Sequence, residues 1–283
     1  MPTDTKFQNQ RRVFQSLHEA GCFVIPNPWD VGSARYLKHL GFKALATTSA
    51  GAAWSMGYAD GDVPPDRMLA HIADIVAATD LPVNADFEGG YADDPDGVAR
   101  NVRLCVDTGV AGLSIEDSTG DSAKPLYEIA HAVERVRAAR EAIDQTGSDV
   151  LLTGRAEGFI RGRPNLDEMI ERLVAYAKAG AHCLYAPGIK TREQISLVIQ
   201  AVAPKPVNVL VGWPSDLTVA DLTALGVRRV SVGGALARAA WGGFIRAASE
   251  IAEVGAFNTL GEGAPAADLN RLFQSDPARR HTP

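Results

Sequence analysis

The stretch DTGVAGLSIED (107–117) runs from a helix end through a glycine into an apolar strand that finishes on two acids. The same order of helix end, glycine and apolar run recurs in HLGFKALAT (39–47), KAGAHCLYA (178–186) and ALGVRRVSV (224–232). A repeated helix-then-strand unit is typical of βα folds, in which the strands are parallel and the crossovers right-handed. The pattern therefore predicts an α/β protein.

Eight short runs rich in Val, Ile and Leu punctuate the chain. They are 22–26, 43–48, 81–87, 110–117, 149–157, 181–187, 206–211 and 227–233. Most are continuous rather than alternating, as expected of strands buried on both faces. Eight βα units in about 230 residues predict a closed (β/α)₈ TIM barrel. An open doubly wound sheet is the alternative, but the first βα turn lacks the G-x-G-x-x-G pattern.

The spacers between these runs have helical periodicity. The segment 166–179 carries an apolar stripe, with Asn165 and Glu168 in capping positions and Gly180 at the expected C-terminal stop. No Pro-, Gly- or Ser-rich linker divides the chain, so we interpret residues 1–283 as one domain. An Ala-, Gly- and Pro-rich C-terminal extension, about 255–283, is expected to pack on the barrel or on a neighbouring subunit.

Composition excludes several classes of protein. The 283 residues include 28 Lys+Arg and 34 Asp+Glu, a formal charge of −6, which argues against nucleic-acid binding. No apolar run approaches the roughly 18 residues that cross a bilayer, and the N-terminus has no signal-peptide pattern, so we expect no membrane association and a cytoplasmic protein. Three cysteines without a C-x-x-C pair exclude a disulfide framework and a structural zinc site.

Acidic side chains gather where the predicted strands end, which is where (β/α)₈ barrels carry function. They are Asp60, Asp86, Glu88, Glu116, Asp117 and Glu157. Carboxylates grouped at one barrel mouth repel each other and are costly to desolvate, and a hard divalent cation relieves both problems. Mg²⁺ prefers oxygen ligands and takes only one or two carboxylates directly. We therefore expect bound Mg²⁺, with Mn²⁺ as the alternative, and Arg155 beside it as a fork for a substrate carboxylate.

Other acids in the same region are interpreted differently. Asp93, Asp94 and Asp96 form DDPDG, which is typical of a turn and a helix start. Asp86 and Glu88, in contrast, end an apolar strand that continues into two glycines, and glycine lets the backbone pass close to a ligand.

Four segments, in order and spacing, carry a resemblance to a known family, and a fifth, GRAE, supports it. They are NPWDVGSARYL (27–37), TTSAGAAWSMGYADG (47–61), VNADFEGGY (83–91), SIED (114–117) and GRAE (154–157). Over roughly residues 20–250 the chain resembles the isocitrate lyase/phosphoenolpyruvate mutase superfamily. The resemblance implies a (β/α)₈ barrel whose eighth helix is exchanged between subunits, and a homo-oligomer built as a dimer of dimers. It also implies Mg²⁺ and a small 2-oxo acid or related carboxylate as substrate, with bonds to carbon made or broken beside an enolate-like centre.

The resemblance also assigns roles by position. Asp86 would be the direct metal ligand, and Asp60, Glu88 and Glu116 would hold metal-bound waters. The turn formed by Ser49, Ala50 and Gly51 would bind the substrate carboxylate and oxo group. Arg155 would clamp the carboxylate, so that Arg155, Glu116 and Ser49 form the catalytic set.

The departures from the family bear on the reaction. Lyase members carry a K-[KR]-C-G-H loop after the fourth strand, whereas this chain reads EDSTGDSAKPLYEI (116–129), with no Cys, and no His before His131. The only Lys of that loop, Lys124, is expected to face solvent. Lyase members also carry a Glu at the end of the sixth strand, in a Pro-Glu pair, where this chain has Pro187–Gly188. A His in the fourth strand of the lyases is replaced here by Ser114.

Cleavage that releases a poor carbanion requires an acid to protonate it, and this loop carries none. Loss of CO₂ from a β-keto acid requires no such acid. We therefore expect a carbon–carbon lyase, with oxaloacetate decarboxylation as the favoured reaction. The alternatives are 2-methylisocitrate or isocitrate lyase-type activity, phosphonopyruvate-type activity, and a non-catalytic barrel that binds a 2-oxo acid.

The segment 235–254 is predicted to be the eighth barrel helix. Its apolar surface is wider than one barrel contact needs, which favours an obligate homodimer or tetramer.

Overall fold

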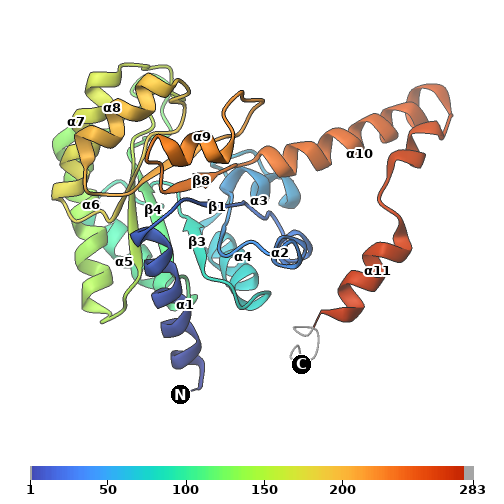
Figure 1. Ribbon diagram of the computed structural model, residues 1–283, viewed down its shortest axis with the longest axis horizontal. Coiled ribbons are helices and arrows are strands. Elements are labelled where there is room, and N and C mark those ends of the chain that lie inside the picture. Colours follow the sequence, from blue (N-terminus) through green and yellow to red (C-terminus); the bar gives the residue numbers. More distant parts are fainter. Residues whose placement is uncertain (1, 277–283) are drawn as a thin grey trace.

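The computed structural model describes residues 2–276 and contains an eight-stranded parallel sheet (Figure 1). Its strands are β1 (Phe23–Ile25), β2 (Leu45–Ala46), β3 (Val83–Asp86), β4 (Gly112–Glu116), β5 (Leu151–Arg155), β6 (Cys183–Tyr185), β7 (Val207–Leu210) and β8 (Arg229–Ser231). The strand order β1-β8-β7-β6-β5-β4-β3-β2 leaves one seam, which a hydrogen bond of 3.1 Å from Ala46 N to Pro26 O bridges. The predicted (β/α)₈ barrel and its eight strands are confirmed.

Helices accompany the strands along the chain. They are α1 (Pro2–Glu19), α2 (Val31–His39), α3 (Ser49–Met56), α4 (Pro65–Ala77), α5 (Pro95–Asp107), α6 (Ile129–Gln145), α7 (Leu166–Lys178), α8 (Arg192–Val202), α9 (Val219–Ala224), α10 (Ala235–Val254) and α11 (Ala266–Ser275), with a 3₁₀ turn at Asn258–Glu262. The predicted start of α7 is confirmed, because the Asn165 side chain accepts a hydrogen bond of 3.1 Å from Glu168 N. Gly180 follows α7 with φ +105°, a conformation that favours glycine.

The N-terminal end of the barrel is filled, and the C-terminal end is left for the site. Helix α1 contributes Phe14, which is fully buried and packs edge-on against Phe23 of β1. Above it the buried Arg229 donates to Asn208 Oδ1 at 2.9 Å and to Thr153 Oγ1 at 3.1 Å, so the charge is held by a polar layer inside the barrel.

Helix α10 points away from the barrel, and the chain then returns through α11 (Figure 1). Ala237 is its one buried residue, whereas Phe244 is 61% and Val254 74% exposed. The end of α11 lies against α2, since Asp276 pairs with Arg35 at 3.5 Å. Residues 277–283 of the predicted extension lie outside the described residues. Within residues 2–276, no helix combines the length and apolarity that a membrane span requires.

Candidate active site

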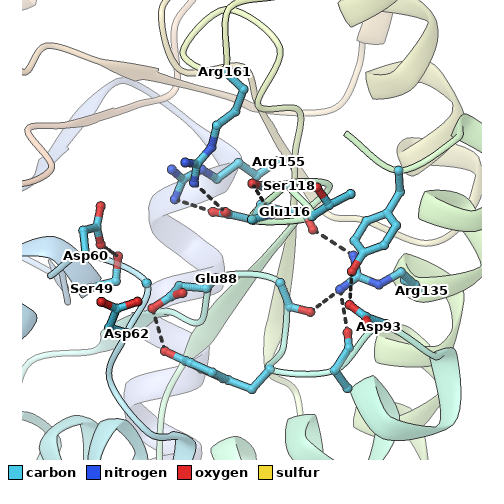
Figure 2. Close-up of a pocket in the computed structure, with 17 residues that line it drawn as sticks. Ser49, Asp60, Asp62, Glu88, Asp93, Glu116, Ser118, Arg135, Arg155 and Arg161 are labelled. Carbon is cyan, nitrogen blue, oxygen red and sulfur yellow. Dashed lines mark hydrogen bonds and ion pairs between the residues drawn. The ribbon is translucent and has the colours of Figure 1, made fainter. Parts of the chain in front are cut away.

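A cavity of about 480 Å³ opens where β3, β4 and β5 end (Figure 2). The predicted residues Ser49, Asp60, Glu88, Glu116 and Arg155 all line it. A second cavity, of about 150 Å³, continues toward the barrel axis; it shares Ser49, Asp60 and Arg155 and adds Ala50 and Asp86. Seven of the eight predicted site residues thus meet in one place.

Gly51 is the exception, because it lines neither cavity. Its N–H donates to Thr48 Oγ1 at 3.3 Å and so belongs to the cap of α3. A Cβ at this position would lie 2.7 Å from the Thr48 side chain and 2.8 Å from that of Trp29. Gly51 therefore makes room for close packing between α3 and its neighbours.

Asp86, at the end of β3, lies between the residues expected to bind a carboxylate. Its Oδ2 accepts hydrogen bonds from Ser49 N and Ser49 Oγ, both at 3.0 Å. Its Oδ1 pairs with Arg155 Nη1 at 3.0 Å. The backbone N–H of Asp86 donates to Thr47 Oγ1 at 2.9 Å, which fixes the strand end. The predicted metal ligand and carboxylate donors are thus in direct contact.

Glu88 is the first residue of a strained turn that follows Phe87. The backbone angle φ is +46° at Glu88 and +54° at Tyr91, and residues other than glycine rarely adopt such values. Tyr91 Oη donates to Glu88 Oε1 at 2.9 Å, which orients the carboxylate. Burial, followed by repulsion from Asp86, raises the pKa of Glu88 to about 7.

Arg155 is the cationic centre of the site. Besides Asp86, it pairs with Glu116 Oε2 at 3.2 Å and with the fully buried Glu157, and its guanidinium lies 5.2 Å from the Tyr185 ring centre. Burial raises the pKa of both Glu116 and Glu157, and Arg155 opposes that rise in each case. The guanidinium therefore offsets part of the free-energy cost of burying these carboxylates.

The donor set fits a hard divalent cation. Five acids, Asp60, Asp86, Glu88, Glu116 and Glu157, lie around Arg155 and Arg161, so the carboxyl groups outnumber these two guanidinium groups. Burial and the Asp86 charge raise the pKa of Asp60, as expected when acids lack sufficient positive charge nearby. Among residues 2–276, no three acidic, His or Cys side chains form a ready-made cage. Mg²⁺ suits this arrangement because it retains several waters and needs few direct carboxylates.

Asp117 faces away from the cavity and holds neighbouring elements together, although it follows Glu116 directly in the sequence. Successive strand residues point to opposite sides, so Glu116 faces the cavity and Asp117 faces α7. Asp117 Oδ2 accepts from Arg172 Nη1 at 3.1 Å and from Tyr176 Oη at 2.6 Å, and all three side chains are buried. Its Oδ1 accepts from Glu157 N at 2.8 Å, which fixes the start of the β5–α7 loop.

The β4–α6 loop is short and closed on itself. Ser118 and Leu126 form an antiparallel bridge, and Thr119 N donates to Pro125 O at 3.1 Å. Lys124 is exposed, as predicted. The loop therefore places no lysine over the cavity.

Sequence reasoning did not place Arg135, Tyr127 and Asp93 in the cavity wall. Arg135, from α6, donates to Glu116 O at 3.1 Å and to Ala92 O at 2.9 Å, so it joins the β3–α5 loop to the end of β4. Tyr127 lies under its guanidinium, 4.2 Å from ring centre to Cζ, and donates to Asp93. The turn interpretation holds for Asp94, which caps α5, but Asp93 also lines the cavity.

Sequence reasoning also missed Arg161, which lies on the β5–α7 loop and lines the cavity. Arg161 reaches Glu116 Oε1 at 3.5 Å and Glu157 Oε2 at 3.6 Å. Its sequence signal was its place six residues after Arg155, on the loop that follows β5.

The family model described as phosphoenolpyruvate phosphomutase matches residues 14–252. The chain belongs to this family. A putative lyase/mutase from Burkholderia cenocepacia superposes with a TM-score of 0.93 at 48% identity, covering 96% of this chain and 99% of the other.

Two further members of the superfamily have named activities. An oxaloacetate decarboxylase from Paraburkholderia xenovorans is 29% identical over 78% of this chain and 74% of its own. The structure of an oxaloacetate acetylhydrolase with its product oxalate superposes with a TM-score of 0.84 at 26% identity, covering 97% and 96% of the two chains. The acetylhydrolase thus shares this barrel, and many superfamily members are carbon–carbon lyases.

The raised pKa of Glu88 predicts that the metal-free protein loses stability as pH rises. The unfolded chain releases this proton near the ordinary value of 4.5, and the folded chain near 7. Between those values the folded state binds the extra proton, so stability present below about pH 4.5 is lost as pH rises through about 7. Melting temperatures in EDTA at about pH 5.5 and 7.5 should show the fall, and Glu88→Gln should flatten it. An equal fall in that variant would contradict the assignment.

Proposed function

We propose that this protein is a Mg²⁺-dependent enzyme that cleaves a carbon–carbon bond of a small 2-oxo dicarboxylate, and that its reaction is oxaloacetate decarboxylation. The observation that carries the proposal is the contact of Asp86 with both Ser49 and Arg155 at the centre of an acid-rich cavity. It puts the proposed metal ligand and two carboxylate-binding groups within reach of one small substrate.

The chain's own residues would bind and orient the substrate. Ser49 N, Ser49 Oγ and Arg155 Nη1 already converge on one carboxylate, that of Asp86, so the same donors suit a substrate carboxylate. Asp86 would hold the cation directly, with Asp60, Glu88 and Glu116 on its water ligands. When bound, Mg²⁺ supplies positive charge opposite the negative charge that develops on the substrate oxo oxygen.

Decarboxylation fits the β4–α6 loop better than cleavage to a carbanion does. Residues 117–128 contain no Cys and no His, and their one lysine is exposed. Loss of CO₂ breaks the C3–C4 bond and leaves the electron pair as the enolate of pyruvate. A proton from water in the open cavity then completes pyruvate at C3, so no acid from the loop is required.

Product identification tests the proposal. Purified protein, oxaloacetate and Mg²⁺ should yield pyruvate and CO₂ in equal amounts, as followed by NMR. Oxalate and acetate would instead show a hydrolytic reaction, and saturable binding without any product would show a 2-oxo acid-binding barrel. Either of those results overturns the proposed reaction.

Isocitrate and 2-methylisocitrate are expected to be poor substrates or none. Their cleavage releases a carbanion that an acid must protonate, and the β4–α6 loop provides no such acid. Release of glyoxylate from isocitrate or of pyruvate from 2-methylisocitrate, measured with a coupled dehydrogenase, should stay at the no-enzyme background. Turnover of roughly 1–10³ per second with either compound would show that the loop argument is wrong.

We also propose that the chain is an obligate homo-oligomer in which α10 crosses to a partner barrel. Its exposed Phe244, Ile245, Ile251 and Val254 leave an apolar surface that a second copy would cover. Deleting residues 235–283 should therefore give insoluble protein, whereas deleting only 277–283 should not. Light scattering that reports a stable, active monomer of about 30 kDa for the full chain would contradict this proposal.

A further inference from the structure

Arg161 reaches over the cavity from the β5–α7 loop (Figure 2). Its backbone N–H donates to Glu157 O at 3.0 Å, so the residue lies in a tight turn directly after β5. Its side chain is 42% exposed, compared with 14% for Arg155. Arg155 is therefore enclosed by the site, whereas Arg161 lies at its opening.

The ion pairs of the two arginines also differ. Arg155 contacts Asp86 at 3.0 Å and Glu116 at 3.2 Å, whereas the two contacts of Arg161, to Glu116 and Glu157, are 3.5 and 3.6 Å long. Half-exposed pairs at such distances contribute little to stability. A guanidinium has five N–H donors, and these loose contacts leave Arg161 with donors free to bind a ligand.

The two guanidinium groups flank a single carboxylate. Arg155 Nη1 contacts Oε2 of Glu116, and Arg161 Nη2 contacts Oε1 of the same group. Both guanidinium groups therefore lie within reach of one small anion. A ligand whose first carboxylate is bound by Arg155 and Ser49 would present its other end to Arg161.

We propose that Arg161 is a specificity-determining residue that binds the second carboxylate of the substrate and so selects dicarboxylates over monocarboxylates. The inference rests on the proposed function. In decarboxylation this carboxylate leaves as neutral CO₂, so its ion pair with Arg161 stabilises bound substrate more than the transition state. Arg161→Gln should accordingly raise KM for oxaloacetate without lowering kcat.

Two inert ligands isolate this role, because they differ only in the distal group: malate carries a carboxylate where 2-hydroxybutanoate carries a methyl. With saturating Mg²⁺, the wild type should bind malate more tightly than 2-hydroxybutanoate. Arg161→Gln should weaken malate binding about 10- to 100-fold and change 2-hydroxybutanoate binding by less than about 2-fold. Arg161→Lys should retain part of the preference, since it keeps the charge.

Arg163→Gln is the matched control. Arg163 lies on the same loop at similar exposure, but it pairs with Glu168 at 3.0 Å instead of the cavity acids. It should leave both dissociation constants unchanged. Equal loss of both ligands in Arg161→Gln, no loss of either, or a wild type without preference for malate would overturn the assignment. Pyruvate formation by the wild type reports separately on the proposed function, so the two failures are distinguishable.

Discussion

Asp86→Asn is expected to abolish Mg²⁺ binding and to lower kcat/KM for oxaloacetate by about 10³-fold or more. The amide keeps an oxygen for the hydrogen bonds from Ser49 but removes the charge that holds a cation. Titration calorimetry with Mg²⁺ and initial rates of pyruvate formation measure the two effects. The fold should survive, because one member of a mutually repelling group of acids has been neutralised.

Asp62→Asn is the control for this substitution, since Asp62 lines the same cavity but is exposed and forms no part of the predicted metal site. It should bind Mg²⁺ as the wild type does. If Asp86→Asn kept wild-type affinity for Mg²⁺, the assignment of Asp86 as the direct ligand would be wrong.

Arg155→Met is expected to lower the free energy of unfolding of the metal-free protein by about 3–5 kcal/mol. The substitution removes the cation shared by Asp86, Glu116 and Glu157, of which Glu157 is fully buried. Urea denaturation in EDTA measures the change. Protonation relieves uncompensated acids, so the loss should be larger at about pH 8 than at about pH 5.5.

Arg161→Met is the comparison for this loss of stability, because Arg161 pairs with two of the same acids, Glu116 and Glu157. Its contacts are longer and its side chain is 42% exposed, so the expected loss is about 1 kcal/mol or less. Equal losses for Arg155→Met and Arg161→Met would show that burial of Arg155 does not carry the stability of the site.

The fold was predictable because strand burial and helix ends leave local marks in the sequence. All five residues of β4 are buried, which explains its continuous apolar run, and Gly180 ends α7 with a positive φ. The role of α1 was not predictable in the same way. Phe14 belongs to a helix that precedes the first strand, and no local pattern says that this helix closes the barrel.

The site was predictable where it depends on strand ends. Asp86 and Glu116 occupy final strand positions, so the barrel brings them together regardless of loop shape. Asp117, one residue later, points the other way and pairs with Arg172, a difference that depends on strand register. Arg135 and Arg161 were missed because their side chains meet the cavity through loop and helix packing.

The closed β4–α6 loop separates this protein from the lyase pattern that its other motifs resemble. Thr119 Oγ1 donates to Lys124 O at 2.5 Å, and Tyr127 N donates to Asp117 O at 3.0 Å, so both ends of the loop are held to each other. Substrate recognition would then fall to groups fixed on the barrel, chiefly Ser49 and Arg155, and to Arg161 at the opening.

Pyruvate formation from oxaloacetate, measured with saturating Mg²⁺, after excess EDTA, and again after Mg²⁺ is restored, tests the proposed chemistry most directly. The expected rate with protein and Mg²⁺ exceeds that with Mg²⁺ alone by at least about 10³-fold, falls to background in EDTA and returns with the metal. A rate that the protein does not raise above the Mg²⁺ background, or one that EDTA leaves unchanged, would contradict Mg²⁺-dependent decarboxylation at Asp86.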